Sequence, residues 1–150
     1  MELSIEIKPL KRRDLRELLL IAKVYYPTDG WLSLTWLEAL EKRAVVGLTA
    51  RWDTRIIGGL IATADKFPNI WLDFMAVDRN VARRGIGERL FTNLERELTA
   101  GSRLWLLVPD NKAFKPSAKF AEKMRMDAAG SLKKWFNGNA GALAFSKKIR

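Results

Sequence analysis

The sequence of 150 residues contains neither cysteine nor histidine. Without cysteine the protein has no disulfides, no thiolate metal ligands and no cysteine nucleophile. Without histidine it has no Ser-His-Asp triad and no imidazole ligand, so we expect no metal site. Any proton transfer must therefore use Asp, Glu, Tyr, Lys, water or the backbone.

Long apolar runs are also missing. No window approaches the roughly 18 consecutive apolar residues of a membrane span. The first residues, Met1–Glu6, lack the charged-then-apolar order of a signal peptide. Together with the absence of cysteine, these features predict a cytoplasmic protein without a membrane partner. Length and an apolar content of 48% predict one globular domain over residues 1–150.

Acidic residues become scarce toward the C-terminus. Ten lysines and arginines follow Asn111, against Glu122 and Asp127, and the whole chain has a net charge of +10. Such a field attracts polyanions, namely nucleic acid, an acidic protein surface or a phosphorylated cofactor. The alternative is a solvated surface that keeps the protein soluble.

Hydrophobic periodicity predicts an alternation of strands and helices. Strands are expected over residues 3–7, 44–52, 55–64, 70–77, 102–108, 131–136 and 142–149. Helices are expected over residues 14–23, 87–98 and 116–124, and a further helix is expected to begin at a cap formed by Ser33 or Thr35. The order β-α-α-β-β-β-α-β-α-β-β predicts an α/β (α+β) domain with a mixed sheet.

Local signals add three expectations. Gly58 and Gly59 predict a bulge or a close approach inside a strand. The continuous apolar run 104–108 is typical of a strand covered on both faces. Residues 137–139, Asn-Gly-Asn, predict the turn of the last hairpin.

The most informative segment is a basic glycine turn between a strand and a helix. The apolar run 70–77 leads into it, and an amphipathic pattern follows Gly87. Gly85 and Gly87 let the backbone approach a ligand closely. The N–H groups that open a helix point the same way and favour an anion, and Arg83 and Arg84 add positive charge. The segment thus predicts a diphosphate site, with a plain tight turn as the alternative.

This order of elements and these residues resemble the GNAT superfamily of N-acetyltransferases over nearly the whole chain. Residues 82–87, Ala-Arg-Arg-Gly-Ile-Gly, resemble the coenzyme A motif Gln/Arg-x-x-Gly-x-Gly/Ala. Asn111 resembles the asparagine that follows the fifth strand, and residues 119–124 resemble the helix written Arg-Phe-Tyr-Glu-Lys-Leu. Ala82 departs from the motif, and Ala121 stands where many members carry the tyrosine that protonates the departing thiolate.

The resemblance implies a mostly antiparallel, twisted sheet flanked by helices. It also implies direct transfer of an acetyl group from acetyl coenzyme A to a primary amine, which could be a protein lysine, an N-terminus or a small amine. Pantetheine would pair with the backbone of one strand, where an N–H group would stabilise the thioester oxyanion, and the pyrophosphate would sit on the amides of the glycine turn. The implied coenzyme-binding residues are Met75, Ala76, Val77, Arg83, Arg84, Gly85, Ile86, Gly87, Glu88 and Asn111.

An amine must lose a proton before it attacks, and lysine has a reference pKa of about 10.4. Asp73 is the candidate base, because it interrupts an apolar strand near the expected thioester. The alternative is that Asp73 faces solvent or pairs with an arginine. Tyr25 and Tyr26 are the candidate acids or acceptor-site residues, with ordinary aromatic packing as the alternative.

A second function remains open beside acetyl transfer. A GNAT-fold module with weak or lost catalysis would use its basic C-terminal part to bind nucleic acid or an acidic protein. Neither the acceptor nor the oligomeric state follows from the sequence, and a homodimer is left open.

Overall fold

The computed structural model describes residues 4–25, 32–110, 114–132 and 141–150. The chain separates into two compact units. The first comprises residues 1–64 and 72–98, and the second comprises residues 65–71 and 99–150. The prediction of a single domain over residues 1–150 stays a prediction.

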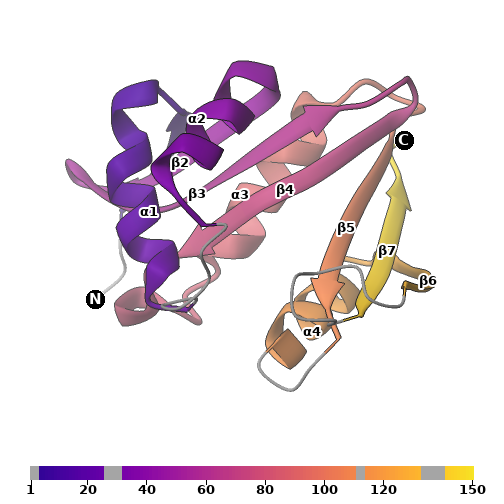
Figure 1. Ribbon diagram of the computed structural model, residues 1–150. Coiled ribbons are helices and arrows are strands. Elements are labelled where there is room, and N and C mark those ends of the chain that lie inside the picture. The colour runs from indigo at the N-terminus through magenta and orange to yellow at the C-terminus, as the bar shows by residue number, and fades with distance from the viewer. Residues whose placement is uncertain (1–3, 26–31, 111–113, 133–140) are drawn as a thin grey trace. The chain divides into compact units, whose positions relative to one another are not determined.

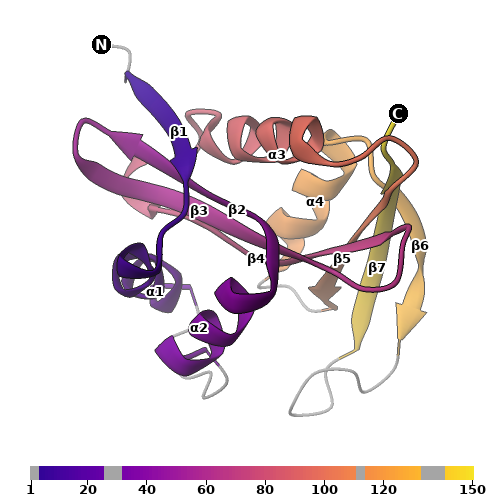
Figure 2. The same ribbon diagram turned by 90° about the horizontal axis from the view of Figure 1, so that it is seen from above.

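The first unit contains strands β1 (Ile5–Pro9), β2 (Ala44–Trp52) and β3 (Arg55–Ala64) and most of β4 (Asn69–Val77). Its helices are α1 (Leu15–Lys23), α2 (Leu34–Arg43) and α3 (Ile86–Glu97), with short 3-10 turns at Arg12–Asp14 and Arg79–Val81. Within this unit α1 and α2 lie on one face of the strands and α3 lies on the other (Figures 1 and 2). Strand β3 is therefore buried along its length except for its two end residues.

Helix α2 begins where its sequence provides a cap. The Ser33 hydroxyl accepts a hydrogen bond from the Trp36 N–H at 3.1 Å, which decides between the two predicted caps in favour of Ser33. The helix then buries Leu37 and Leu40 against the core that α1 shares with β3 and β4. This core contains Leu15, Leu18, Ala22, Leu32, Leu37, Leu40, Ile56, Ile61, Phe74 and Ala76.

The glycine pair in β3 is required by close packing. A Cβ atom on Gly59 would lie 2.7 Å from Leu18 Cδ2, and one on Gly58 would lie 2.9 Å from the Ala76 carbonyl oxygen. The pairing of β2 with β3 also shifts register between Ala50 and Arg51. Both predicted features, a bulge and a close approach, are present here.

The second unit contains the start of β4, then β5 (Arg103–Pro109), α4 (Lys115–Lys123), β6 (Asp127–Leu132) and β7 (Ala142–Lys148). The first three residues of β4 pair in parallel with Arg103, Leu104 and Trp105 of β5, and β7 pairs antiparallel with β5 and β6. The hydrogen-bonded strand order is β1-β2-β3-β4-β5-β7-β6, with β4 contributing to both units. This confirms the predicted mixed, mostly antiparallel sheet and the element order.

Two expectations for the second unit need correction. Strand β6 begins at Asp127, four residues before the predicted start at Ser131. The reason is that Arg125, at φ 64°, ends the turn after α4, and buried Met126 then starts an extended segment whose pairing begins at Asp127. Strand β5 is covered less completely than expected, since Leu104 and Val108 are buried while Trp105, Leu106 and Leu107 are half-buried. The predicted turn at 137–139 lies outside the described residues.

Candidate coenzyme and acyl-transfer site

The glycine turn is attached firmly to the end of β4. The Asp78 N–H donates to the Ile57 carbonyl at 2.8 Å, and the Asp78 carboxylate accepts from Asn80 N–H at 2.9 Å and from Arg55 Nη2 at 2.8 Å. Val81 is buried in the following 3-10 turn. These contacts fix the point from which the basic turn leaves the sheet.

The turn itself has the backbone of an anion-binding loop. Arg83 and Gly85 both have positive φ, at 66° and 76°, with Arg84 between them. When right-handed and left-handed conformations alternate along the backbone, successive N–H groups point toward one side of the chain. A Cβ atom on Gly85 would find no atom within 4 Å, and the side chains of Arg83 and Arg84 are exposed. The turn is therefore open to a ligand.

Helix α3 starts directly at this turn. Gly85 is its N-cap residue, and the Arg89 N–H donates to the Gly85 carbonyl at 3.0 Å. The first amides of a helix have no acceptor within the helix, and the helix dipole adds positive potential there. Ile86, Leu90, Phe91 and Leu94 are buried and anchor α3 against the strands. The sequence prediction of a basic turn that opens a helix is confirmed in its geometry.

The strand segment before the turn lies in the first unit, where β3 is its neighbour on one edge and no further described strand of that unit lies on the other. Ala76 is buried, while Met75 and Val77 are half-buried. Tyr25 follows the end of α1, and its hydroxyl donates a hydrogen bond to the Val77 carbonyl at 2.8 Å. A tyrosine is thereby held at the end of the strand on which pantetheine was expected.

Tyr25 is more than an aromatic packed in the core, because 47% of its surface is exposed. Desolvation raises its pKa above 10.0, the nearby Asp78 carboxylate raises it further, and Arg79 acts in the opposite direction. The hydroxyl therefore stays protonated at neutral pH and can donate a proton. Tyr26 and Asn111 lie outside the described residues.

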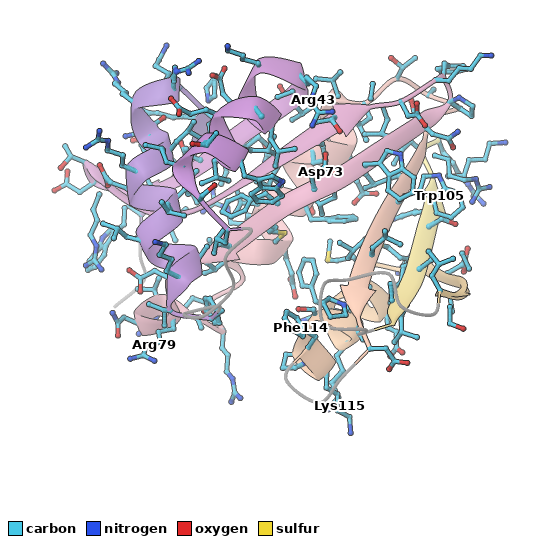
Figure 3. All side chains as sticks on the ribbon, viewed as in Figure 1. Arg43, Asp73, Arg79, Trp105, Phe114 and Lys115 are labelled. Atoms are coloured by element: carbon cyan, nitrogen blue, oxygen red, sulfur yellow. The ribbon has the colours of Figure 1, made fainter. Side chains whose placement is uncertain are left out.

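Asp73 lies in the middle of β4 and is the exposed residue of that strand, as one of the two alternatives expected, but its carboxylate is also hydrogen-bonded. The Thr63 hydroxyl of β3 donates to Asp73 Oδ2 at 2.5 Å, which is at the short end of hydrogen bonds to a carboxylate. Arg43, the last residue of α2, lies near Asp73 (Figure 3). No ion pair shorter than 4.0 Å joins these two described residues, so the alternative of an arginine pair does not apply.

Opposing effects act on the Asp73 carboxyl. Burial raises its pKa above 3.8, whereas the Thr63 hydrogen bond and the positive charge of Arg43 lower it. The residue as a whole is exposed, but desolvation of its carboxyl is the largest of these effects. A carboxylate of this kind is a stronger proton acceptor than an ordinary surface aspartate.

The sequence singled out Asp73 as a candidate, but it did not single out Thr63 and Arg43, which act on its carboxylate. Thr63 is a β-branched residue in a strand, and Arg43 is a basic residue in the last turn of a helix, so each has an ordinary structural explanation. Only the pairing of neighbouring elements brings them to the same carboxylate. Ala121 is fully buried in α4 and provides no proton donor at its position.

Within the described ranges, no group of three or more Asp and Glu side chains could hold a metal ion. The helices in the described part of the chain are all too short or too polar to cross a bilayer.

The chain belongs to the acetyltransferase (GNAT) family, whose model matches residues 12–125. The chain is therefore a member of a family of acyltransferase enzymes. No curated protein sequence matches it.

Solved structures with the same fold include several acetyltransferases. The ribosomal-protein-S18-alanine N-acetyltransferase from Escherichia coli superimposes with a TM-score of 0.81 at 19% identity, covering 97% of this chain and 94% of that one. Ard1 from Thermoplasma volcanium gives a TM-score of 0.86 at 13% identity, covering 98% and 99%. Arabidopsis thaliana NAA60, solved in complex with acetyl-CoA, gives a TM-score of 0.76 at 16% identity, covering 97% of this chain and 99% of that one. These likenesses establish the shared fold.

Proposed function

We propose that this protein transfers an acetyl group from acetyl coenzyme A directly to a primary amine. The observation that carries the proposal is the turn 83–88, in which two left-handed residues, an open glycine and the start of α3 combine beside two exposed arginines. This donor set fits a diphosphate, because backbone N–H groups, a helix N-terminus and guanidinium groups all favour anions. The family supports the same assignment.

The proposed coenzyme site extends from this turn along β4. The amides of Arg83, Arg84, Gly85, Ile86, Gly87 and Glu88 would hold the pyrophosphate, and the backbone of Met75, Ala76 and Val77 would pair with pantetheine. Asn111 remains a proposed contact from sequence alone. A strand N–H near the thioester would stabilise negative charge on the carbonyl oxygen during transfer.

The coenzyme would supply an acetyl thioester, and residues of the chain would handle the protons. In the balanced reaction, the acceptor nitrogen gains the acetyl group and loses a proton, while the C–S bond breaks with its electron pair and one proton going to sulfur. Asp73 would accept the proton from the amine, directly or through water, since its pKa is raised by burial. Tyr25, whose hydroxyl stays protonated, would donate the proton to sulfur after its hydroxyl leaves the Val77 carbonyl.

An acceptor panel tests this proposal. Release of the coenzyme thiol would be followed with acetyl-CoA and each of three probes: a tripeptide with a free N-terminal alanine, spermidine and glucosamine. At least one amine should raise the rate of thiol release above the rate of acetyl-CoA hydrolysis without an amine. The mass of that amine should increase by one acetyl group in place of a hydrogen. If no amine does so in a protein that binds the coenzyme, direct N-acetylation is wrong.

Asp73→Asn tests the base. Loss of a positioned general base lowers rates by typically 10²–10⁴-fold. We expect kcat to fall by roughly a hundredfold and Kd for acetyl-CoA to stay within about twofold. The wild-type enzyme should show an acidic limb above pH 3.8 that the variant lacks, because burial raises the pKa of Asp73. An unchanged rate across pH would exclude Asp73 as the base.

A second candidate function rests on charge. The second unit contains twelve lysines and arginines against four aspartates and glutamates, so it carries +8 of the net charge of +10. Such a surface fits nucleic acid or an acidic protein. Binding of a fluorescent single-stranded RNA that weakens steeply with added salt would support this function, and no binding at low salt would remove it.

A further inference from the structure

The carboxylate of Asp73 is held by a single side chain from the neighbouring strand. Thr63 is almost entirely buried, with 7% of its surface exposed, and its hydroxyl donates to Asp73 Oδ2 at 2.5 Å. A hydroxyl has one proton to donate, so Thr63 here acts as a donor to a charged acceptor. Because Thr63 is a β-branched residue in a strand, its χ1 angle is restricted and the donor direction is nearly fixed.

This contact leaves the two carboxylate oxygens unequal. Oδ2 accepts from the Thr63 hydroxyl, and a weaker hydrogen bond from the Thr63 backbone also lowers the pKa of the carboxyl, while no described side chain donates to Oδ1. Among the described residues, Arg43 from α2 is the charged group that acts on the carboxylate, and it does so without a direct ion pair. The charged form of Asp73 is therefore favoured by Thr63 and by the charge of Arg43, and no side chain among the described residues covers Oδ1.

We propose that Thr63 is a positioning residue for the acetyl transfer, which orients the carboxylate of Asp73 and keeps its second oxygen available to the acceptor amine. This inference rests on the proposed function, in which Asp73 accepts the proton of the amine. Arg43 contributes only its field, so it favours the ionised carboxylate without fixing its direction. The two residues therefore have separable effects on the reaction.

The orienting effect of Thr63 and the charge effect of Arg43 can be tested with separate variants. Thr63→Val removes the donor with little change of shape, Thr63→Ser keeps a hydroxyl, and Arg43→Gln removes the charge but leaves the hydrogen bond. Thr49→Val is the matched control: Thr49 is fully buried in β2 of the same unit and its hydroxyl donates to the Lys8 carbonyl at 3.3 Å. Folding is checked by circular dichroism and coenzyme Kd for every variant.

The experiment measures the pH dependence of kcat with the acceptor that is fastest among the tripeptide, spermidine and glucosamine. Removing either stabiliser of the ionised form raises the pKa of Asp73, so Thr63→Val and Arg43→Gln should both move the acidic limb to higher pH. Only Thr63→Val should also lower the plateau rate, by roughly tenfold or more, because orientation is lost. Thr63→Ser should recover most of that rate.

An acceptor-independent measurement accompanies the kinetics. The ¹³C shift of the Asp73 carboxyl, assigned by its loss in Asp73→Asn, should titrate at higher pH in Thr63→Val than in the wild type or Thr49→Val. An unchanged acidic limb and plateau rate in Thr63→Val would overturn the positioning role, and so would an equal effect in Thr49→Val. If Asp73→Asn is itself fully active, the base assignment fails first and the Thr63 inference falls with it.

Discussion

Gly85 allows the folding and ligand-binding roles of one residue to be separated. Its φ of 76° lies in the left-handed region, and a Cβ atom there would meet no atom within 4 Å. Gly85→Ala therefore creates no clash within the protein, and its effect on folding is conformational alone. A left-handed backbone costs a non-glycine residue about 1–2 kcal/mol, which predicts a Tm lower by about 3–6 °C for a chain of this size.

Gly130 provides a matched control for this change. It has φ 139° in β6 of the second unit, and a Cβ atom there also meets nothing within 4 Å. Because φ 139° is a region that only glycine adopts readily, Gly130→Ala should lower stability at least as much as Gly85→Ala, without touching the proposed coenzyme site. Titration calorimetry with acetyl-CoA should then show about tenfold weaker binding for Gly85→Ala and an unchanged Kd for Gly130→Ala, because only Gly85 lies where backbone must approach a phosphate.

Gly85→Asp extends the same comparison. A carboxylate about 5 Å from a phosphate charge, at an effective dielectric constant of about 20, is repelled by about 3 kcal/mol, which is more than a hundredfold in Kd. The protein should still fold, because the position is open. Equal acetyl-CoA affinity in the Gly85→Ala and Gly130→Ala proteins, or micromolar affinity in Gly85→Asp, would refute the assignment of this turn to the pyrophosphate.

Three further changes test the framework and the proton donor. Gly59→Ala should destabilise the first unit by roughly 2 kcal/mol in urea unfolding, since its Cβ would lie 2.7 Å from Leu18 Cδ2; unchanged stability would mean that the helix shifts freely. Asp14→Asn should cost about 3 kcal/mol in the same assay, because Asp14 is buried and pairs with Arg51 at 3.0 Å, and a loss below 1 kcal/mol would contradict this. Tyr25→Phe should lower kcat by roughly tenfold and leave Kd for acetyl-CoA nearly unchanged, whereas an equal kcat would exclude Tyr25 as the acid.

Much of the fold could be predicted because its signals are local. Strands β2 and β3 begin and end where alternation and the turn at Asp53 predict, and α2 starts at a serine whose side chain can cap it. Strand β6 was placed four residues late because Ala128, Ala129 and Gly130 have weak strand propensity, so its pairing with β7 decides the start.

The candidate site was predictable only in part, because only some of its features are local in the sequence. The turn around Gly85 is contiguous in sequence, and the positive φ angle of Gly85 is one that glycine adopts readily. The positive φ angle of Arg83 could not be predicted, because arginine rarely adopts it. The contact of Thr63 with Asp73 joins residues ten apart on neighbouring strands, and that of Tyr25 with Val77 joins residues 52 apart. Such contacts depend on strand register and helix placement, which composition and spacing do not specify.

The most direct test of coenzyme-dependent acetyl transfer is titration of the wild-type protein with acetyl-CoA in a calorimeter. The open turn at Gly85, between two exposed arginines and the start of α3, predicts saturable one-to-one binding with Kd below about 1 mM. Absence of binding heat at millimolar coenzyme, confirmed by equilibrium dialysis, would contradict the proposed pyrophosphate site and the enzymatic function built on it.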